Sequence, residues 1–213
     1  GNWLRRGRLS LLRKLLTSLS LPTDASLLEV GAGVGQNLPL LAEFGSVDAA
    51  EIDELGLHRL SQLDFVDTTY TEPIPFELKR HYDVICALDV VEHLEDDRAA
   101  VSWVSSGLTE NGHFVAAVPT YQWLFGEHDR ALGHYRRYTK SSFLTLLPED
   151  LEVVTAGYFN SAVFPAVAAA RLAGHLKDRV STSSGAPQKQ SSSLPGPVDK
   201  AMASVLEWEA TIF

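Results

Sequence analysis

The chain opens with leucines at helical spacing and then changes to short apolar runs that alternate with amphipathic stretches. The first pattern predicts a helix to about Leu19, and a turn at Pro22 separates it from an apolar strand that starts at Ser26. Further strands are predicted at 47–52, 65–69, 83–88, 112–119 and 151–158, with helices at 36–44, 55–62, 98–108 and 139–147. Alternating strands and crossover helices predict an α/β fold with a doubly wound, mainly parallel sheet.

The pattern loosens after Tyr158. Residues 181–197 are rich in Ser, Pro, Gly and Gln, which indicates a mobile loop, and residues 198–213 have the spacing of one last amphipathic helix. We therefore divide the chain into a leading helix, a sheet domain and a helical extension. These cover residues 1–20, 21–160 and 161–213.

Composition narrows the function. The net charge of −9 argues against a sequence-independent grip on bulk nucleic acid, which needs clustered Lys and Arg. The single cysteine, Cys86, lies inside an apolar run, and a lone cysteine suits a reducing, cytoplasmic setting. No apolar run is long enough to span a bilayer, although the basic, leucine-rich segment 3–16 also fits a helix on a membrane surface.

A glycine-rich turn follows the first strand, in the run Leu27 to Gly35. Gly31 and Gly33 would let the backbone approach a ligand closely, and Gly35 is expected to open a helix at the next residue. A dinucleotide fingerprint needs its third glycine at position 36, where this chain has Gln36, so the spacing points away from a nicotinamide cofactor.

With Glu29 before it, this G-x-G-x-G turn resembles the first motif of the class I S-adenosylmethionine-dependent methyltransferases. The resemblance implies the Rossmann-like fold of that family, with S-adenosylmethionine bound by the glycine loop, including Ala32, and Glu29 supporting the loop. It also implies that an acid at the end of the second strand binds both ribose hydroxyls. Glu51, followed by Ile52, is our candidate, and Asp53 is the alternative because two residues further along a strand the side chain faces the same way.

Three further features follow from the resemblance. The helix at 1–20 would cover the cofactor, and the antiparallel strand that normally closes the fold has no convincing candidate after Tyr158. The family often carries Gly-Asp after the third strand to bind adenine, whereas this chain has Thr69 and Tyr70 there. Asp67 would serve only with a shifted loop.

Leu88 and Asp89 follow the fourth strand, at the sheet edge where ligands of open α/β folds bind. In the methyltransferase family the equivalent stretch lines the cofactor's methionyl arm and the acceptor pocket, so we expect both residues at the cofactor. The alternative role for Asp89 is to cap the following helical turn.

On such a turn Asp89, Glu92 and His93 would project from one face. Together with His134 they resemble the magnesium site of small-RNA 2′-O-methyltransferases, and a mixture of carboxylate and imidazole suits Mg, Mn or Zn. Glu-His after the fourth strand also occurs in methyltransferases that use no metal. We therefore do not favour a divalent metal, and expect His93 in the substrate pocket.

The segment 119–139 is the richest in polar and aromatic residues, and a loop of this length is usually functional. Tyr121 and Trp123 offer stacking surface to a small-molecule acceptor, and His134 or His128 would fit as a general base for a hydroxyl. Part of this segment resembles a bacterial subgroup found among envelope-sugar and secondary-metabolite enzymes.

The sequence thus predicts an S-adenosylmethionine-dependent methyltransferase acting on an O or N atom of a small molecule. Two alternatives stay open: a non-catalytic module that binds S-adenosylmethionine, and a metal-assisted O-methyltransferase. Arg136 and Arg137 would pair either with an anionic acceptor or with acids of the chain itself. No oligomeric state follows from the sequence.

Overall fold

The structure is a computed structural model, and it describes residues 2–161, 164–165 and 204–206. The chain divides into two compact units, which we call the sheet unit and the helical unit. The sheet unit comprises residues 20–122 and 133–154. The helical unit comprises residues 1–19, 123–132 and 155–213.

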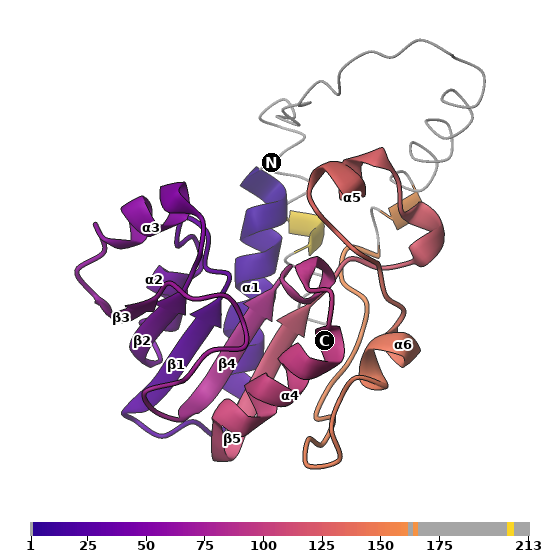
Figure 1. The fold of residues 1–213 in the computed structure, drawn as a ribbon. Coiled ribbons are helices and arrows are strands. Elements are labelled where there is room, and N and C mark those ends of the chain that lie inside the picture. The colour runs from indigo at the N-terminus through magenta and orange to yellow at the C-terminus, as the bar shows by residue number, and fades with distance from the viewer. Residues whose placement is uncertain (1, 162–163, 166–203, 207–213) are drawn as a thin grey trace. The chain divides into compact units, whose positions relative to one another are not determined.

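The sheet unit is built on five parallel strands in the order β3-β2-β1-β4-β5 (Figure 1). The strands are β1 (Ala25–Val30), β2 (Gly45–Ala50), β3 (Val66–Tyr70), β4 (Tyr82–Leu88) and β5 (Leu108–Ala117). The chain leaves β1 toward β2 on one side and later returns to β4 on the other. This reversal places the carboxyl ends of β1 and β4 at the crevice where open α/β folds bind ligands. The predicted doubly wound parallel fold is confirmed.

The helices of the sheet unit are α2 (Leu38–Leu41), α3 (Glu54–Leu60), α4 (Asp97–Gly107) and α6 (Lys140–Leu144), with a 3-10 turn, η1 (Val91–His93). Side-chain caps start several of them. The carboxylate of Asp53 accepts a hydrogen bond from the Gly56 amide at 3.1 Å, and Asp96 accepts one from Ala99 at 2.9 Å. Such caps satisfy amides that have no partner within the helix.

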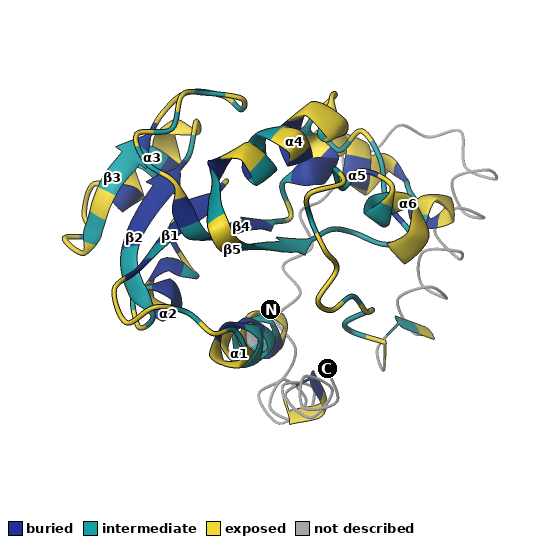
Figure 2. Cartoon of the chain, turned by 90° about the horizontal axis from the view of Figure 1, so that it is seen from below, coloured by how far each residue is buried: buried dark blue, intermediate teal, exposed yellow. Residues whose placement is uncertain are grey.

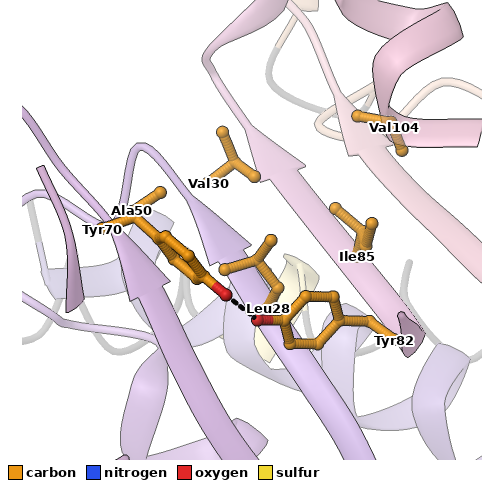
Figure 3. Close-up of a cluster of buried hydrophobic side chains, with 7 residues drawn as sticks. All are labelled: Leu28, Val30, Ala50, Tyr70, Tyr82, Ile85 and Val104. Atoms are coloured by element: carbon orange, nitrogen blue, oxygen red, sulfur yellow. Dashed lines mark hydrogen bonds between the residues drawn. The ribbon is translucent and has the colours of Figure 1, made fainter. Parts of the chain in front are cut away.

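One face of the sheet packs against α4 through a buried cluster (Figure 3). Its members are Leu28, Val30, Ala50, Tyr70, Tyr82, Ile85 and Val104. The cluster includes a polar contact, because the hydroxyls of Tyr70 and Tyr82 lie 2.8 Å apart. Tyr82 also donates a hydrogen bond at 2.6 Å to Asp48 of β2, whose carboxylate is buried. The guanidinium of Arg80 lies 3.0 Å from the same carboxylate oxygen.

Several element boundaries differ from those expected. The helix expected from Gln36 begins at Leu38, because the turn continues past the last glycine. The helix expected to end near residue 108 stops at Gly107, and β5 begins directly at Leu108, with a register shift between Tyr82 and Val84 of β4.

The strand predicted at 151–158 does not form. Val153 and Val154 are both exposed, so the segment has no buried face to specify a strand. Strand propensity alone does not suffice, because a strand needs a partner and a surface to pack on. Within the described residues β5 is consequently an edge of the sheet.

The helical unit contains α1 (Asn2–Ser18) and α5 (Glu127–Ala131), and a short 3-10 turn, η2 (Gln122–Leu124), runs across the boundary between the units in sequence. Leu12 and Leu16 of α1 are buried. Figure 2 colours each described residue by its burial, with buried positions in dark blue. No helix among the described residues is long and apolar enough to cross a bilayer.

The predicted loop at 181–197 lies outside the described residues, as does most of the predicted helix at 198–213, of which residues 204–206 are described and helical.

Candidate functional site

The glycine turn after β1 requires glycine at each of its three positions. Gly31, Gly33 and Gly35 have φ angles of 63°, 56° and 75°, in the left-handed region that side chains disfavour. A Cβ on Gly31 would lie 2.6 Å from a methyl of Val90, whereas one on Gly33 would meet nothing. Gly31 therefore also serves close packing of the turn against the end of β4. Ala32 is buried, and its amide donates to the Ala50 carbonyl at 3.1 Å.

Glu29 lies in β1, two residues before the turn, and is buried. Its Oε1 accepts a hydrogen bond from the side-chain amide of Asn37 at 2.6 Å, which ties the strand to the chain just before α2. Burial, together with the nearby Glu29 charge, raises the pKa of the Cys86 thiol. Asn37 had not been expected at the site, and its position two residues after the last glycine is the only sequence signal for it.

Glu51 directly follows β2 and folds back onto the glycine turn. Its Oε2 accepts a hydrogen bond from the Gly33 amide at 2.6 Å, and its Oε1 accepts from Ile52 and Asp53 at 2.7 and 2.8 Å. Asp53 caps α3 instead, through its bond to the Gly56 amide. The geometry thus separates the two acids that the sequence left open, since Glu51 alone is bonded to the turn.

Gly56, which no sequence motif indicates, packs where Glu51 meets the glycine turn. A Cβ at this position would lie 2.7 Å from Cγ of Glu51 and 2.8 Å from the Gly33 carbonyl oxygen. Its hydrogen atom therefore leaves room for the acid and the glycine turn to meet. The signal in the sequence was a glycine in the first turn of a helix, where it lowers helix propensity.

At the end of β4, Leu88 is half-buried and Asp89 is exposed. Asp89 has a φ of 59°, rare for a residue with a side chain, and its amide donates to the Ala117 carbonyl at 2.9 Å. The capping role considered for Asp89 is wrong, because Val90 occupies the position before η1 and no side chain caps that turn. A strained backbone at the ligand-binding edge of a sheet is a feature of functional sites.

Glu92, His93 and His134 come together. One potential ligand atom from each lies within 4.8 Å of the others, and the two imidazole rings meet edge to face with centroids 4.5 Å apart. Glu92 is fully buried, His134 is half-buried and His93 is exposed. Asp89, predicted with them, is outside this group.

Hydrogen bonds connect the segment after His134 to η1 and to the residues that follow η1. The Tyr135 amide donates to the Glu92 carbonyl at 2.8 Å, and Arg136 pairs with Asp97 at 2.6 Å while donating to the Glu95 carbonyl at 2.7 Å. Burial by itself would raise the pKa of Asp97, but bonds from Arg136 and Tyr138 outweigh it and lower that pKa. Of the two expectations for Arg136, the pairing with an acid of the chain is therefore confirmed.

Tyr121, in the segment between β5 and His134, has an unusual backbone conformation. Its φ is 64°, and its amide donates to the Tyr138 carbonyl at 2.7 Å. A positive φ at an aromatic residue is a genuine outlier, which marks Tyr121 as constrained by its surroundings.

The remaining predicted residues lie elsewhere. Trp123 and His128 are exposed and belong to the helical unit, where the Trp123 ring packs edge-on against Phe164 at 6.2 Å. Asp67 is exposed on β3, and its carboxylate lies 3.9 Å from the Arg80 guanidinium. An adenine-binding acid in the loop after β3 is not supplied by Asp67.

The fold is similar to that of solved methyltransferase structures. Three solved structures share the fold, and the match spans less than two thirds of the length of each. The first is a Bacillus halodurans C-125 protein assigned as a methyltransferase, with 19% identity, a TM-score of 0.51, and coverage of 63% of this chain and 65% of that one. The second is DesVI of Streptomyces venezuelae, with 23% identity, a TM-score of 0.50, and coverage of 57% of this chain and 54% of that one. The third is the plantazolicin methyltransferase BpumL, with 18% identity, a TM-score of 0.55, and coverage of 68% of this chain and 62% of that one. The BpumL structure contains a pentazolic desmethylPZN analogue and S-adenosylhomocysteine.

No curated protein matches the chain. A family model described as a methyltransferase domain matches residues 4–150, which is more than half of the chain. This match covers β1 to β5, the glycine turn, Glu51 and the cluster at the end of β4. By that match and by its Rossmann-like sheet, the chain belongs to the methyltransferase domain family.

Proposed function

We propose that this protein is an S-adenosylmethionine-dependent methyltransferase that transfers a methyl group to an O or N atom of a small molecule. The observation that carries the proposal is the bond between the Glu51 carboxylate and the Gly33 amide at 2.6 Å. It brings the acid that follows β2 onto the glycine turn that follows β1, at the carboxyl edge of a parallel sheet. A ribose diol and the rest of a nucleoside fit that combination of carboxylate and close-approaching backbone.

Apolar side chains around the same turn support a nucleoside ligand. Val34 in the turn, Ile52 after β2 and Leu55 in α3 are 41%, 62% and 61% exposed. Exposed apolar groups grouped at one place commonly mark a binding surface. Adenine would rest on them, with Leu88 and Asp89 at the methionyl end of the cofactor. This arrangement dispenses with an acidic contact from the β3 loop.

The reaction is an in-line displacement at the sulfonium methyl group. The carbon–sulfur bond breaks, its electron pair stays on sulfur to give S-adenosylhomocysteine, and a lone pair of the acceptor O or N forms the new bond. Holding the two reactants in line supplies most of the acceleration, because positioning of this kind has effective molarities of about 10⁵ M or more. An amine acceptor arrives neutral and sheds its proton afterwards.

A hydroxyl acceptor needs to lose its proton, and His134 is the candidate base. His134 belongs to the same unit as the cofactor residues and lies beside Glu92 and His93. Proton removal by a positioned base contributes about 10²–10⁴ in rate. Tyr121 and His93, both in the sheet unit, would line the acceptor pocket. The net charge of −9 disfavours a nucleic-acid acceptor.

The decisive experiment is calorimetric titration of S-adenosylmethionine and S-adenosylhomocysteine into the wild type, Glu51→Ala and Glu54→Ala. Glu54 is the matched control, an exposed acid three residues further along in the first turn of α3. We expect binding by the wild type and by the control, and its loss in Glu51→Ala. Absence of binding in a folded wild type, shown by circular dichroism, would refute the cofactor. Binding without turnover on any acceptor would favour the non-catalytic alternative.

A further inference from the structure

We propose that Glu92, His93 and His134 bind a single divalent transition-metal ion at the carboxyl end of β4. The three potential ligand atoms lie within 4.8 Å of one another. Four-coordinate ions with bonds of about 2.0–2.2 Å to N and O hold their ligands about 3.4 Å apart. The three ligand atoms therefore need to approach one another by at most about 1.4 Å. His93 is exposed, so its side chain has room to rotate toward the other two.

The backbone that carries the ligands is positioned before any ion arrives. Glu92 and His93 are adjacent in η1, and His134 follows Gly133, whose φ of 77° turns the chain sharply at that point. The bond from the Tyr135 amide to the Glu92 carbonyl then joins the two arms next to the ligands themselves. Assembly of the site consequently costs only side-chain rotation, which is small compared with ordering a loop.

The paired charges of Asp97 and Arg136 strengthen the same junction from one side. Arg136, two residues after His134, pairs with Asp97 at 2.6 Å and donates to the Glu95 carbonyl at 2.7 Å. It therefore joins the His134 segment to the chain between η1 and the start of α4. Neither residue is a ligand. They are positioning residues, which fix the distance between the two arms of the site.

The donor set selects the class of ion. Two imidazoles and one carboxylate suit borderline ions such as Zn²⁺, Mn²⁺, Fe²⁺ or Co²⁺, whereas Mg²⁺ and Ca²⁺ prefer oxygen ligands. Asp89, the second carboxylate expected in a magnesium-type site, lies outside the cluster. The negative charge of the fully buried Glu92 carboxylate is also better compensated by a bound cation than by a neutral substrate.

The place of the site suggests its use, and this step rests on the proposed function. Gly31 of the glycine turn packs against Val90, two residues before Glu92, so the cluster adjoins the expected cofactor loop. A hydroxyl bound to the ion would release its proton to water near neutral pH, and the resulting alkoxide would attack the methyl group. His134 then acts as a ligand, and the ion takes over the activation that a base would otherwise provide.

The test measures metal binding directly, on the full chain without a histidine tag and stripped of metal with a chelator. ZnCl₂, CoCl₂ and MgCl₂ are titrated at neutral pH by calorimetry, and bound metal is counted after dialysis. We expect one Zn²⁺ per chain, visible absorption bands of four-coordinate Co²⁺, and no Mg²⁺ binding. His93→Ala and His134→Ala should weaken Zn²⁺ binding by more than about 100-fold, since loss of a supporting partner alone costs about 10–100-fold.

Two controls keep the outcome interpretable. His81→Ala removes an exposed imidazole just before β4, at the opposite end of that strand from the cluster, and should bind Zn²⁺ as the wild type does. Glu92→Gln retains the shape of the buried side chain and should weaken Zn²⁺ binding while the protein stays folded. Equal Zn²⁺ affinity of the wild type and His134→Ala would overturn the site, and Mg²⁺ binding at the same residues would overturn the argument from the donor set.

Titration of S-adenosylmethionine on the same variants separates this inference from the proposed function. Loss of Zn²⁺ with retained cofactor binding in His134→Ala places the metal at the acceptor side. Zn²⁺ binding by a wild type that binds no S-adenosylmethionine would leave the metal site standing and remove the methyltransferase proposal. Methylation that survives complete chelation would refute the role of the ion in activating the acceptor.

Discussion

Replacing Tyr82 by Phe removes one hydroxyl from the middle of the buried network drawn in part in Figure 3. That hydroxyl donates to Asp48 at 2.6 Å and accepts from Tyr70, whose own oxygen accepts from the Lys79 amide. The ring stays in place, so no cavity of ring size is created. In Tyr82→Phe the Asp48 carboxylate keeps only its contact with Arg80, and the Tyr70 proton loses its partner.

The magnitude follows from the two lost bonds. A hydrogen bond to a charged group contributes about 1.5–3 kcal/mol and a neutral one about 0.5–1.5 kcal/mol, so the variant should lose about 2–4.5 kcal/mol. That is a large part of the 5–15 kcal/mol, roughly, that stabilises a typical domain. Urea unfolding followed by circular dichroism should show a midpoint about 1 M or more below that of the wild type, with an unchanged slope. Tyr135→Phe, at an exposed position, is the control.

The same pair of proteins tests the electrostatics through pH. Burial, with the bonds to Asp48 and Tyr70, raises the pKa of Tyr82 above its ordinary value near 10. The unfolded chain therefore releases this proton at a pH where the folded protein retains it, and wild-type stability falls as pH rises above 10. Tyr82 should contribute about 1.4 kcal/mol to this fall at pH 11. The pKa values of Tyr138 and Cys86 are raised as well, so both proteins lose stability in this range, and the fall in the wild type should exceed that in Tyr82→Phe by the Tyr82 contribution. A stability difference that stays constant from pH 8 to pH 11, or a variant as stable as the wild type at pH 8, would refute the reasoning.

Three further outcomes are expected. Gly56→Ala should weaken S-adenosylmethionine binding at least about tenfold in calorimetry without loss of helix, because the methyl group collides with the acid and the glycine turn; Gly107→Ala, a glycine at the end of α4, is the control, and equal affinity of the two would contradict the packing argument. Asp97→Asn should lower the free energy of unfolding by about 1–3 kcal/mol in urea and weaken Zn²⁺ binding, since it breaks a half-buried ion pair; unchanged values for both would show that the junction is incidental. Asn37→Ala should cost about 1–3 kcal/mol of stability, because Glu29 loses its 2.6 Å donor in a buried position, and thermal unfolding of the two proteins at pH 7 measures it.

The glycine turn could be predicted because its constraint is local. A backbone in the left-handed region needs glycine wherever it occurs, so three such residues after an apolar run leave few alternatives. The grouping of Glu92 with His93 follows in the same way from adjacency in one short turn. His134 was found by residue type, and its approach to Glu92 depends on a long-range amide bond that no spacing encodes.

Other features were beyond the sequence for physical reasons. Glu51 and Asp53 are two residues apart, so a strand pattern places both on one face, and only the hydrogen bonds separate the cap of α3 from the acid on the glycine turn. The segment 151–158 has strand-forming residues but no buried face, since Val153 and Val154 are both exposed. Asp89 was predicted on one face of a helical turn with Glu92 and His93, but its backbone is left-handed and it lies before η1. Residue counting along a helix does not predict that conformation.

The three amide bonds of Glu51 have a consequence for how a ligand enters. A carboxylate offers about four acceptor positions, and the amides of Gly33, Ile52 and Asp53 occupy three of them. A vicinal diol has two hydroxyls to satisfy, so one amide must let go when both bind. For the nucleoside ligand that we propose, entry at this turn would thus be an exchange of donors, and the amide that is released would report occupancy as a change in its NMR shift and hydrogen-exchange rate.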